Sequence, residues 1–252
     1  MMETLIILFL LIPLVSLQTV VGVGVLVIGT PTLMILDYNI IEIFCVLLPV
    51  SITTSLINLL LIINKIDFNE RSLIFIDLRN ILTNFFFICL PLMTIGLIII
   101  TNIYEIIKIE FIVSFFIIFS LIIKKFRSKF FFKIIDRYKR MTLGIVGFFH
   151  GMTNTGGTLL SLILISEDGI SKENYRLKMH FFYLLLAVFQ LITLFLLNSN
   201  ILKFNNYFLI LPICGVIFGN LIVKKLDNII IENTIIILAS ISSIFLITKN
   251  II

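Results

Sequence analysis

Charge is scarce in this sequence. Only 13% of its 252 residues are Asp, Glu, Lys or Arg, and 60% are hydrophobic. An average soluble domain carries about twice that share of charge, and the mean hydropathy here is +1.21. The composition therefore excludes a soluble globular domain and indicates a polytopic membrane protein. The net charge of +5 does not indicate nucleic-acid binding, because the basic residues lie in loops between apolar runs.

Signatures of catalysis and metal binding are also missing. Trp is absent, and the cysteines Cys45, Cys89 and Cys214 lie in apolar runs without the spacing of a metal site. The sequence has no ATP-binding GxxxxGK loop, no HExxH motif, no paired carboxylates and no serine in a GxSxG elbow. We therefore expect no enzyme activity, no cofactor and no metal. Energy for any transport must come from a gradient or from the substrate's own concentration difference.

Eight apolar runs are long enough to cross a bilayer, which takes about 20 residues. We therefore expect an all-α integral membrane protein with about eight transmembrane helices. The first run is too long for one straight helix, and it is either a kinked span or a span followed by a re-entrant segment. The runs cover residues 4–35, 40–63, 73–100, 103–123, 141–166, 179–198, 205–223 and 229–248.

A basic stretch at 124–140, KKFRSKFFFKIIDRYKR, lies between the fourth and fifth runs. We interpret it as a solvated cytoplasmic linker held near anionic headgroups. Residues 1–123 then form a first four-span repeat and residues 141–252 a second one. Two halves with an even number of spans keep the same orientation.

The distribution of Lys and Arg predicts the orientation, because cytoplasmic loops are enriched in both. The loop at 64–79, the linker, Lys203 and Lys249 form the more basic side. Both termini are therefore predicted to be cytoplasmic, in a multi-pass protein of the cytoplasmic membrane. The opposite side then holds Lys108, Lys172, Arg176, Lys178, Lys224 and Lys225.

Two polar, glycine-rich stretches interrupt the apolar runs. The first is QTVVGVGVLVIGTPTL at 18–33, and the second is HGMTNTGGTLLSLI at 150–163. Interruptions at matching places in two halves are the best sequence indication of a transporter's substrate site. A shift of 132 residues aligns Gln18 with His150, Gly22 with Asn154, Gly24 with Gly156 and Asn58 with Gln190.

The polar residues in these runs suit an anion. Asn58 and Gln190 place amides in otherwise apolar spans, and broken helices expose backbone N–H groups. No deep carboxylate is present to hold a bare cation. His150 lies near mid-depth, where it either bonds to a neighbouring helix, binds substrate or carries a proton. Asp77 and Arg79 are expected at the mouth of the third run, and Arg176 and His180 at the opposite interface.

The same residues resemble the sulfite exporter TauE/SafE family of membrane permeases. That resemblance covers nearly the whole chain. The first half of the family typically shows a glutamine, then a G-x-G, and then a proline and a leucine. The second half departs from the family pattern at His150, Asn154 and Ile163. The resemblance implies transport of small organosulfur or related anions, such as sulfite or sulfonates. The matching residues are Gln18, Gly22, Gly24, Pro31 and Leu33, then Gly147, Gly151, Gly156 and Gly157, and Arg176.

The sequence thus predicts a secondary transporter that moves a small anion across the lipid bilayer by alternating access. A membrane-embedded enzyme or accessory subunit using His150 is one alternative, and an anion channel is another. The anion, the direction, the coupling ion (a proton or sodium) and homo-oligomer formation stay open. The expected lining residues are Gln18, Gly22, Gly24, Thr30, Pro31, Asn58, His150, Asn154, Thr155, Gly156, Gly157 and Gln190.

Overall fold

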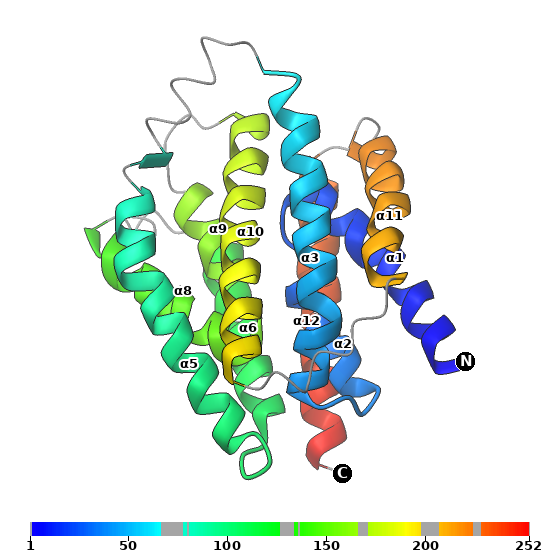
Figure 1. Ribbon diagram of the computed structural model, residues 1–252, viewed down its shortest axis with the longest axis vertical. Helices are drawn as coiled ribbons and strands as arrows, with labels where there is room; N and C mark the ends of the chain where they lie inside the picture. Colours follow the sequence, from blue (N-terminus) through cyan, green and yellow to red (C-terminus); the bar gives the residue numbers. More distant parts are fainter. Residues whose placement is uncertain are drawn as a thin grey trace.

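The computed structural model is all-α, as predicted (Figure 1). It describes residues 2–66, 78–79, 81–126, 134–135, 137–165, 171–197, 207–223 and 228–251. The predicted mouth residue Asp77 lies outside this set, whereas Arg79 is exposed. The elements are α1 (Met2–Val21), α2 (Val25–Ile35), α3 (Ile40–Ile63), the π-helical turn η1 (Phe85–Cys89), α5 (Leu90–Ile103), α6 (Ile109–Phe126), α8 (Lys139–Thr153), α9 (Gly157–Ile165), α10 (Lys172–Leu197), α11 (Tyr207–Val223) and α12 (Asn228–Ile251).

Three of the described helices are long and apolar enough to cross a membrane: Ile40–Ile63, Ile81–Ile103 and Glu173–Leu197. Large apolar side chains also cover the outside of the molecule, which soluble monomers avoid. These features fit a helical membrane protein. Exposed examples are Leu56, Leu60 and Leu61 of α3, Ile192, Phe195 and Leu196 of α10, and Ile213, Ile217 and Phe218 of α11.

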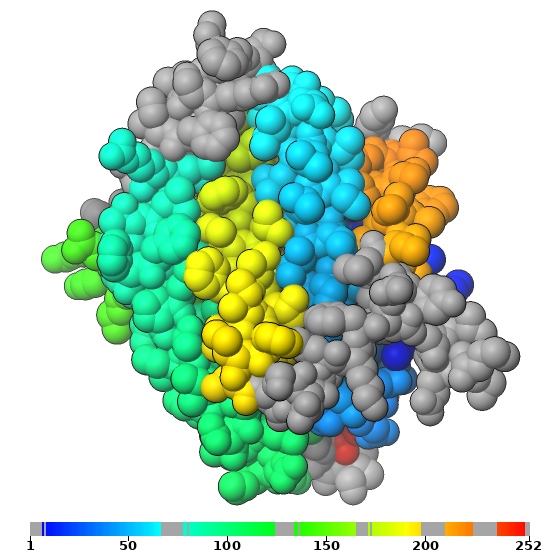
Figure 2. All heavy atoms as spheres, in the orientation of Figure 1, coloured from blue at the N-terminus to red at the C-terminus, as the bar shows by residue number. Residues whose placement is uncertain are grey.

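Helices α3 and α10 lie side by side along the middle of the molecule (Figures 1 and 2). Figure 2 shows α5 beside α10 on one flank and α11 beside α3 on the other. Further pairs are α1 against α11, α5 against α8, and α6 against α12. Glycines let two of these pairs approach closely: a Cβ on Gly151 of α8 would clash with the Met93 carbonyl oxygen of α5, and one on Gly219 of α11 would lie 2.6 Å from the Thr19 Cβ of α1.

The first apolar run is a helical hairpin rather than a single span. A Cβ on Gly24 would lie 3.0 Å from the Leu14 carbonyl oxygen, and one on Gly29 3.4 Å from the Leu14 Cδ1. A helix that continued forward past the break would carry Gly29 roughly 20 Å from Leu14, at 1.5 Å per residue. Helix α2 therefore turns back along α1, so of the two predicted arrangements the straightforward kink is wrong. Helices α8 and α9 also pack against each other after a break, so the fifth run is not one continuous span either.

The two hairpins change which loops share an end of the molecule. In the last turn of α12, Lys249 donates to the Ile35 carbonyl oxygen and pairs with Asp37, both at the end where α3 begins. Lys65 lies past the opposite end of α3, a helix of 24 residues and thus about 36 Å long. The prediction that placed Lys249 on the same side as the 64–79 loop is therefore not what the structure shows. A helix that turns back does not cross the molecule, and the sequence count treated both hairpins as crossings.

Candidate functional site

The first helix break is built on a left-handed residue. Gly22 has φ of +79°, and its amide donates to the Gln18 carbonyl oxygen at 2.7 Å, closing the last turn of α1. A side chain in this backbone conformation is strained, and glycine avoids that cost. Gly24 then brings α2 directly onto α1, because a Cβ at this position would lie 2.7 Å from the Gln18 amide nitrogen.

The second break repeats this geometry 132 residues later. Asn154, aligned with Gly22, has φ of +61°, and its amide donates to the His150 carbonyl oxygen at 2.9 Å. Asparagine tolerates the left-handed region better than other side chains, which accounts for its replacement of glycine here. Gly156, aligned with Gly24, packs against Val146 and His150, the counterparts of Leu14 and Gln18. The local equivalence predicted by the 132-residue shift is thus present at both turns.

A first polar cluster, formed by Gln18, Thr19, Ser51, Ser55 and Asn58, joins the end of α1 to α3. The Gln18 Nε2 donates to the Ser55 Oγ at 3.1 Å and to the Ser51 Oγ at 3.3 Å. The Asn58 Nδ2 donates to the Thr19 Oγ1 at 3.1 Å. All five side chains are fully buried. The serine hydroxyls can donate as well as accept, so the Gln18 amide can present either its oxygen or its NH₂ group to a ligand.

A second polar cluster, formed by His150, Asn154, Tyr183 and Gln190, joins the α8–α9 turn to α10. The Gln190 Nε2 donates to the His150 carbonyl oxygen at 3.4 Å. The rings of His150 and Tyr183 meet edge-on, with centroids 6.3 Å apart. The Tyr183 hydroxyl lies where a Cβ of Gly157 would be, at the first residue of α9. A phenol therefore sits directly against the N-terminus of a broken helix.

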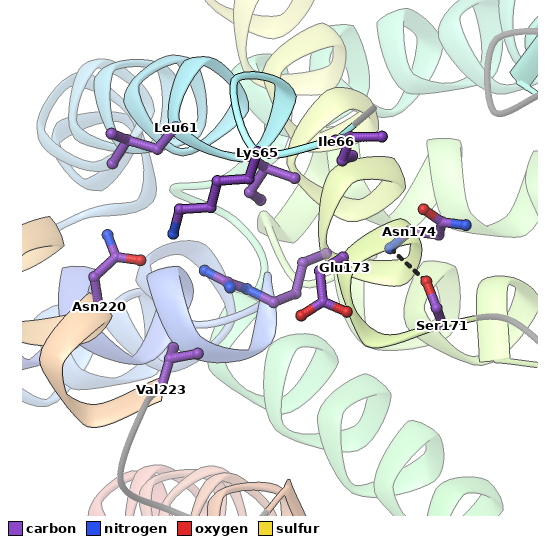
Figure 3. Close-up of a pocket in the computed structure, with 10 residues that line it drawn as sticks. Leu61, Lys65, Ile66, Ser171, Glu173, Asn174, Asn220 and Val223 are labelled. Carbon is purple, nitrogen blue, oxygen red and sulfur yellow. Dashed lines mark hydrogen bonds between the residues drawn. The ribbon is translucent and has the colours of Figure 1, made fainter. Parts of the chain in front are cut away.

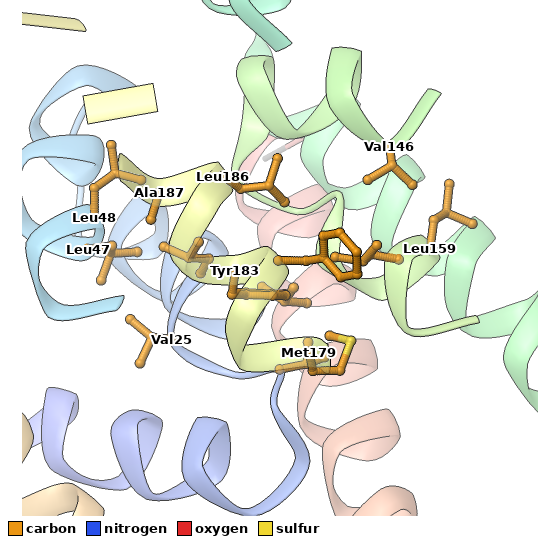
Figure 4. Close-up of a cluster of buried hydrophobic side chains, with 14 of the residues drawn as sticks. Val25, Leu47, Leu48, Val146, Leu159, Met179, Tyr183, Leu186 and Ala187 are labelled. Atoms are coloured by element: carbon orange, nitrogen blue, oxygen red, sulfur yellow. The ribbon is translucent and has the colours of Figure 1, made fainter. Parts of the chain in front are cut away.

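Helix α10 contacts both breaks. A Cβ on Gly22 would lie 2.6 Å from the Met179 Cβ, and Tyr183 occupies the space beside Gly157. Met179 and Tyr183 are four residues apart on one helix, which corresponds to about 6 Å of rise. Figure 4 shows Met179 and Tyr183 on α10 between Val25 and Leu47 on one side and Val146 and Leu159 on the other. The two turns are therefore held on one helix about one turn apart.

Many buried polar atoms around these turns lack a hydrogen-bond partner among the described residues. Natural interiors leave few such groups, because each unsatisfied one costs free energy. Their concentration at two helix breaks indicates a place for water or a polar ligand. The atoms at the two turns are Gln18 Oε1, Asn58 Oδ1, both ring nitrogens of His150, both side-chain polar atoms of Asn154, Tyr183 OH and Gln190 Oε1. Others among the described residues are Thr30 Oγ1, Ser114 Oγ, Arg176 Nε and both ring nitrogens of His180.

The predicted lining residues are all buried, but they divide into groups. Gln18, Gly22, Gly24 and Asn58 lie at the first turn. His150, Asn154, Gly156, Gly157 and Gln190 lie at the second, together with Thr155, whose hydroxyl bonds to that of Thr153. Thr30 and Pro31 are inside α2, about a turn and a half past the first break. Pro31 therefore does not cause that break.

Other polar residues have local roles or contacts that the sequence did not indicate. Thr53 and Thr54 donate to carbonyls of their own helix, the ordinary role of threonine in membrane helices. Arg176 and His180, predicted near an interface, are buried within the protein in the first turns of α10, and the Arg176 Nη2 donates to the Thr19 carbonyl oxygen at 2.7 Å. Tyr183 was missed altogether. Arg176, His180, Tyr183 and Gln190 follow one stripe of α10, and their spacing of four, three and seven residues carried that signal.

Comparison with known proteins does not assign this chain to a family. No family model, no curated protein and no solved structure matches this chain. Within the described residues, no group of three or more His, Cys, Asp or Glu side chains could hold a metal ion.

Proposed function

We propose that the protein is a secondary transporter that carries a small anion across the cytoplasmic membrane by alternating access. The observation that supports this most is the contact of one helix, α10, with both helix breaks, about one turn apart. Broken helices inside a membrane protein are tolerated where they line a ligand site or a watery cavity. The resemblance to TauE/SafE permeases favours an organosulfur or sulfite-like anion.

The chemistry of the second cluster favours an anion over a cation. His150, Tyr183 and Asn154 can all donate hydrogen bonds, and none of their polar side-chain atoms bonds to a described residue. The backbone N–H groups of the first turn of α9 add a partial positive charge beside them. Neither polar cluster contains a carboxylate. A bare cation would have no countercharge here, whereas an anion would meet several donors.

The equivalences between residues 1–123 and 141–252 support an internal repeat. Helix α1 packs on α11 as α8 packs on α5, while α3 packs on its counterpart α10 and α6 on its counterpart α12. In this proposal each half is a re-entrant hairpin followed by three crossings. An odd number of crossings inverts the second half relative to the first. Inverted repeats let the two hairpins exchange roles between the outward-open and inward-open states.

This architecture reverses the predicted orientation of the termini. Lys65 and Arg176 lie at one end of the molecule, since both line a single pocket there. Helix α11 ends there at Val223, which lines the same pocket, and Lys224 and Lys225 follow it in the sequence. Among the basic residues of the described helices, Lys249 lies at the other end, beside Ile35 and Asp37. By the positive-inside rule, the end with the pocket is cytoplasmic and both termini lie outside.

Cysteine labelling tests this orientation. In a background without native cysteines, Leu36→Cys is expected to react with an impermeant maleimide on intact cells. Asn64→Cys, at the far end of α3, is expected to react only after permeabilisation. Both positions are exposed, and they flank one helix, so each serves as the control for the other. The opposite labelling pattern would restore cytoplasmic termini.

Tyr183→Phe tests the function. The phenol oxygen is buried and bonds to no described residue, so its removal should leave the melting temperature unchanged or slightly higher. If the hydroxyl donates to the anion, the loss of a charge-assisted bond is worth about 1.5–3 kcal/mol, or roughly ten- to a hundredfold in affinity. The measurement is uptake of radiolabelled sulfite and related anions into proteoliposomes. Tyr104→Phe, at a half-buried tyrosine outside both clusters whose hydroxyl donates to Glu105, is the control, and equal half-saturation in both variants would contradict the proposed site.

A further inference from the structure

A polar pocket lies at the end of the molecule where α3 and α11 end and α10 begins. Its volume is about 530 Å³, within the range of small-molecule sites. Figure 3 shows Lys65, Glu173 and Asn220 around this space, from three separate parts of the chain. The lining residues that matter for its chemistry are Leu61, Lys65, Glu173, Arg176 and Asn220.

The inner wall of the pocket carries a guanidinium group that forms no ion pair with a described residue. Arg176 is only 6% exposed, and its Nε has no hydrogen-bond partner among the described residues. Its Nη2 is fixed by the Thr19 carbonyl oxygen. Burying a charge is costly unless the charge is paired, and no described carboxylate lies within ion-pair distance of this group. An anion in the pocket would supply the missing charge.

The pocket holds two further charged side chains besides Arg176, one cation and one carboxylate. Lys65 is exposed and lines the same pocket, so it adds a mobile positive charge. Glu173 is exposed and weakens the attraction for an anion, but it is the only carboxylate among the described residues that line the pocket. A planar guanidinium fork together with an ammonium group suits the several oxygens of a small oxyanion.

We propose that this pocket binds a small oxyanion through Arg176 and Lys65, separately from the two helix breaks. Arg176 also holds the last turn of α1 through Thr19, which accepts from Asn58 in the first polar cluster. The pocket therefore adjoins the first break. Its role as the cytoplasmic entrance for substrate rests on the proposed function, whereas the binding of an oxyanion does not. A soluble anion and the phosphate of a lipid headgroup share this chemistry.

The absence of Trp from the sequence permits a direct binding assay. Leu61→Trp places a single reporter in the pocket wall, at a position that is 40% exposed. Purified protein in detergent is titrated with sodium sulfate at constant ionic strength, and in a second series with short-chain phosphatidylglycerol. We expect a saturable change in emission in at least one series, and the tighter ligand identifies the source of the oxyanion.

Charge variants in the Leu61→Trp background decide the assignment. Arg176→Gln should weaken binding at least tenfold, Arg176→Lys less, and Lys65→Gln roughly three- to tenfold. Glu173→Gln should tighten binding, and Lys108→Gln, outside the pocket, should leave it unchanged. Lys65→Gln changes an exposed side chain, so it tests the proposal even if the Arg176 variants fail to fold. No saturable signal with either ligand, or equal affinity in Lys65→Gln and the parent, would overturn the proposal.

Variants in the second polar cluster test the proposed function separately from the pocket. Tyr183→Phe should impair transport while leaving oxyanion binding in the pocket intact. A protein that binds sulfate through Arg176 but transports no anion would remove the proposed function and keep the pocket. Transport that is unaffected in Lys65→Gln, together with unchanged pocket affinity, would remove the pocket and keep the function.

Discussion

Gly22→Ala is expected to lower the apparent melting temperature by roughly 5–15 °C and to abolish most transport. Two costs combine at this position. An L-residue in the left-handed region costs about 1–2 kcal/mol, and the new Cβ would lie 2.6 Å from the Met179 Cβ on α10. Overpacking of that kind typically costs about 1–3 kcal/mol. For a chain of this size, each kcal/mol corresponds to roughly 2–4 °C.

Asn154 provides the matched control, because its backbone is also left-handed. In stability, Asn154→Ala should show the conformational cost without a clash against Met179, and Asn154→Gly should be close to neutral. The measurement is thermal stability by fluorescence-detected size-exclusion, with uptake assayed in parallel. If Gly22→Ala is no more damaging than Asn154→Ala, Met179 does not constrain the first turn. The argument that α10 holds both turns would then lose its main support.

The two turns could be predicted from sequence because their chemistry is local. A glycine or asparagine at the left-handed position, followed two residues later by glycine, is visible in QTVVGVG and HGMTNTG. The reversal of the chain at these turns could not be predicted in the same way. A glycine pair permits both a kink and a hairpin, and the choice depends on tertiary contacts such as Gly24 against Leu14.

The burial of the polar stripe of α10 was not predicted, for a related reason. The sequence placed the start of this span at residue 179, because Lys172, Glu173, Arg176 and Lys178 lower the local hydropathy. The helix actually begins at Lys172, and Arg176 is buried against the last turn of α1. A hydropathy window cannot distinguish a polar turn that faces water from one that faces another polar turn. The packing of α10 against the α1–α2 hairpin determines that this polar turn faces protein rather than water.

His150→Leu is expected to reduce transport by roughly ten- to a hundredfold without preventing insertion of the protein. Both ring nitrogens are buried and make no hydrogen bond to a described residue, so leucine removes no protein–protein bond. A neutral imidazole carries one N–H donor, and loss of one bond to a charged ligand, at about 1.5–3 kcal/mol, corresponds to roughly ten- to a hundredfold in affinity. His150→Gln retains a donor and copies Gln18, the aligned residue at the first turn. It should therefore stay within about tenfold of the parent.

The same pair of variants separates a binding histidine from a proton carrier. Imidazole is the side chain that ordinarily titrates near neutral pH, and glutamine does not titrate. We expect His150→Gln to keep the pH response of the parent, because Gln18 occupies the matching place in the first half and cannot carry a proton. Proteoliposomes with and without an imposed pH gradient provide the measurement, with substrate exchange as the uncoupled reference. If His150→Gln loses gradient-driven accumulation but retains exchange, the histidine carries the coupled proton and the binding role is wrong.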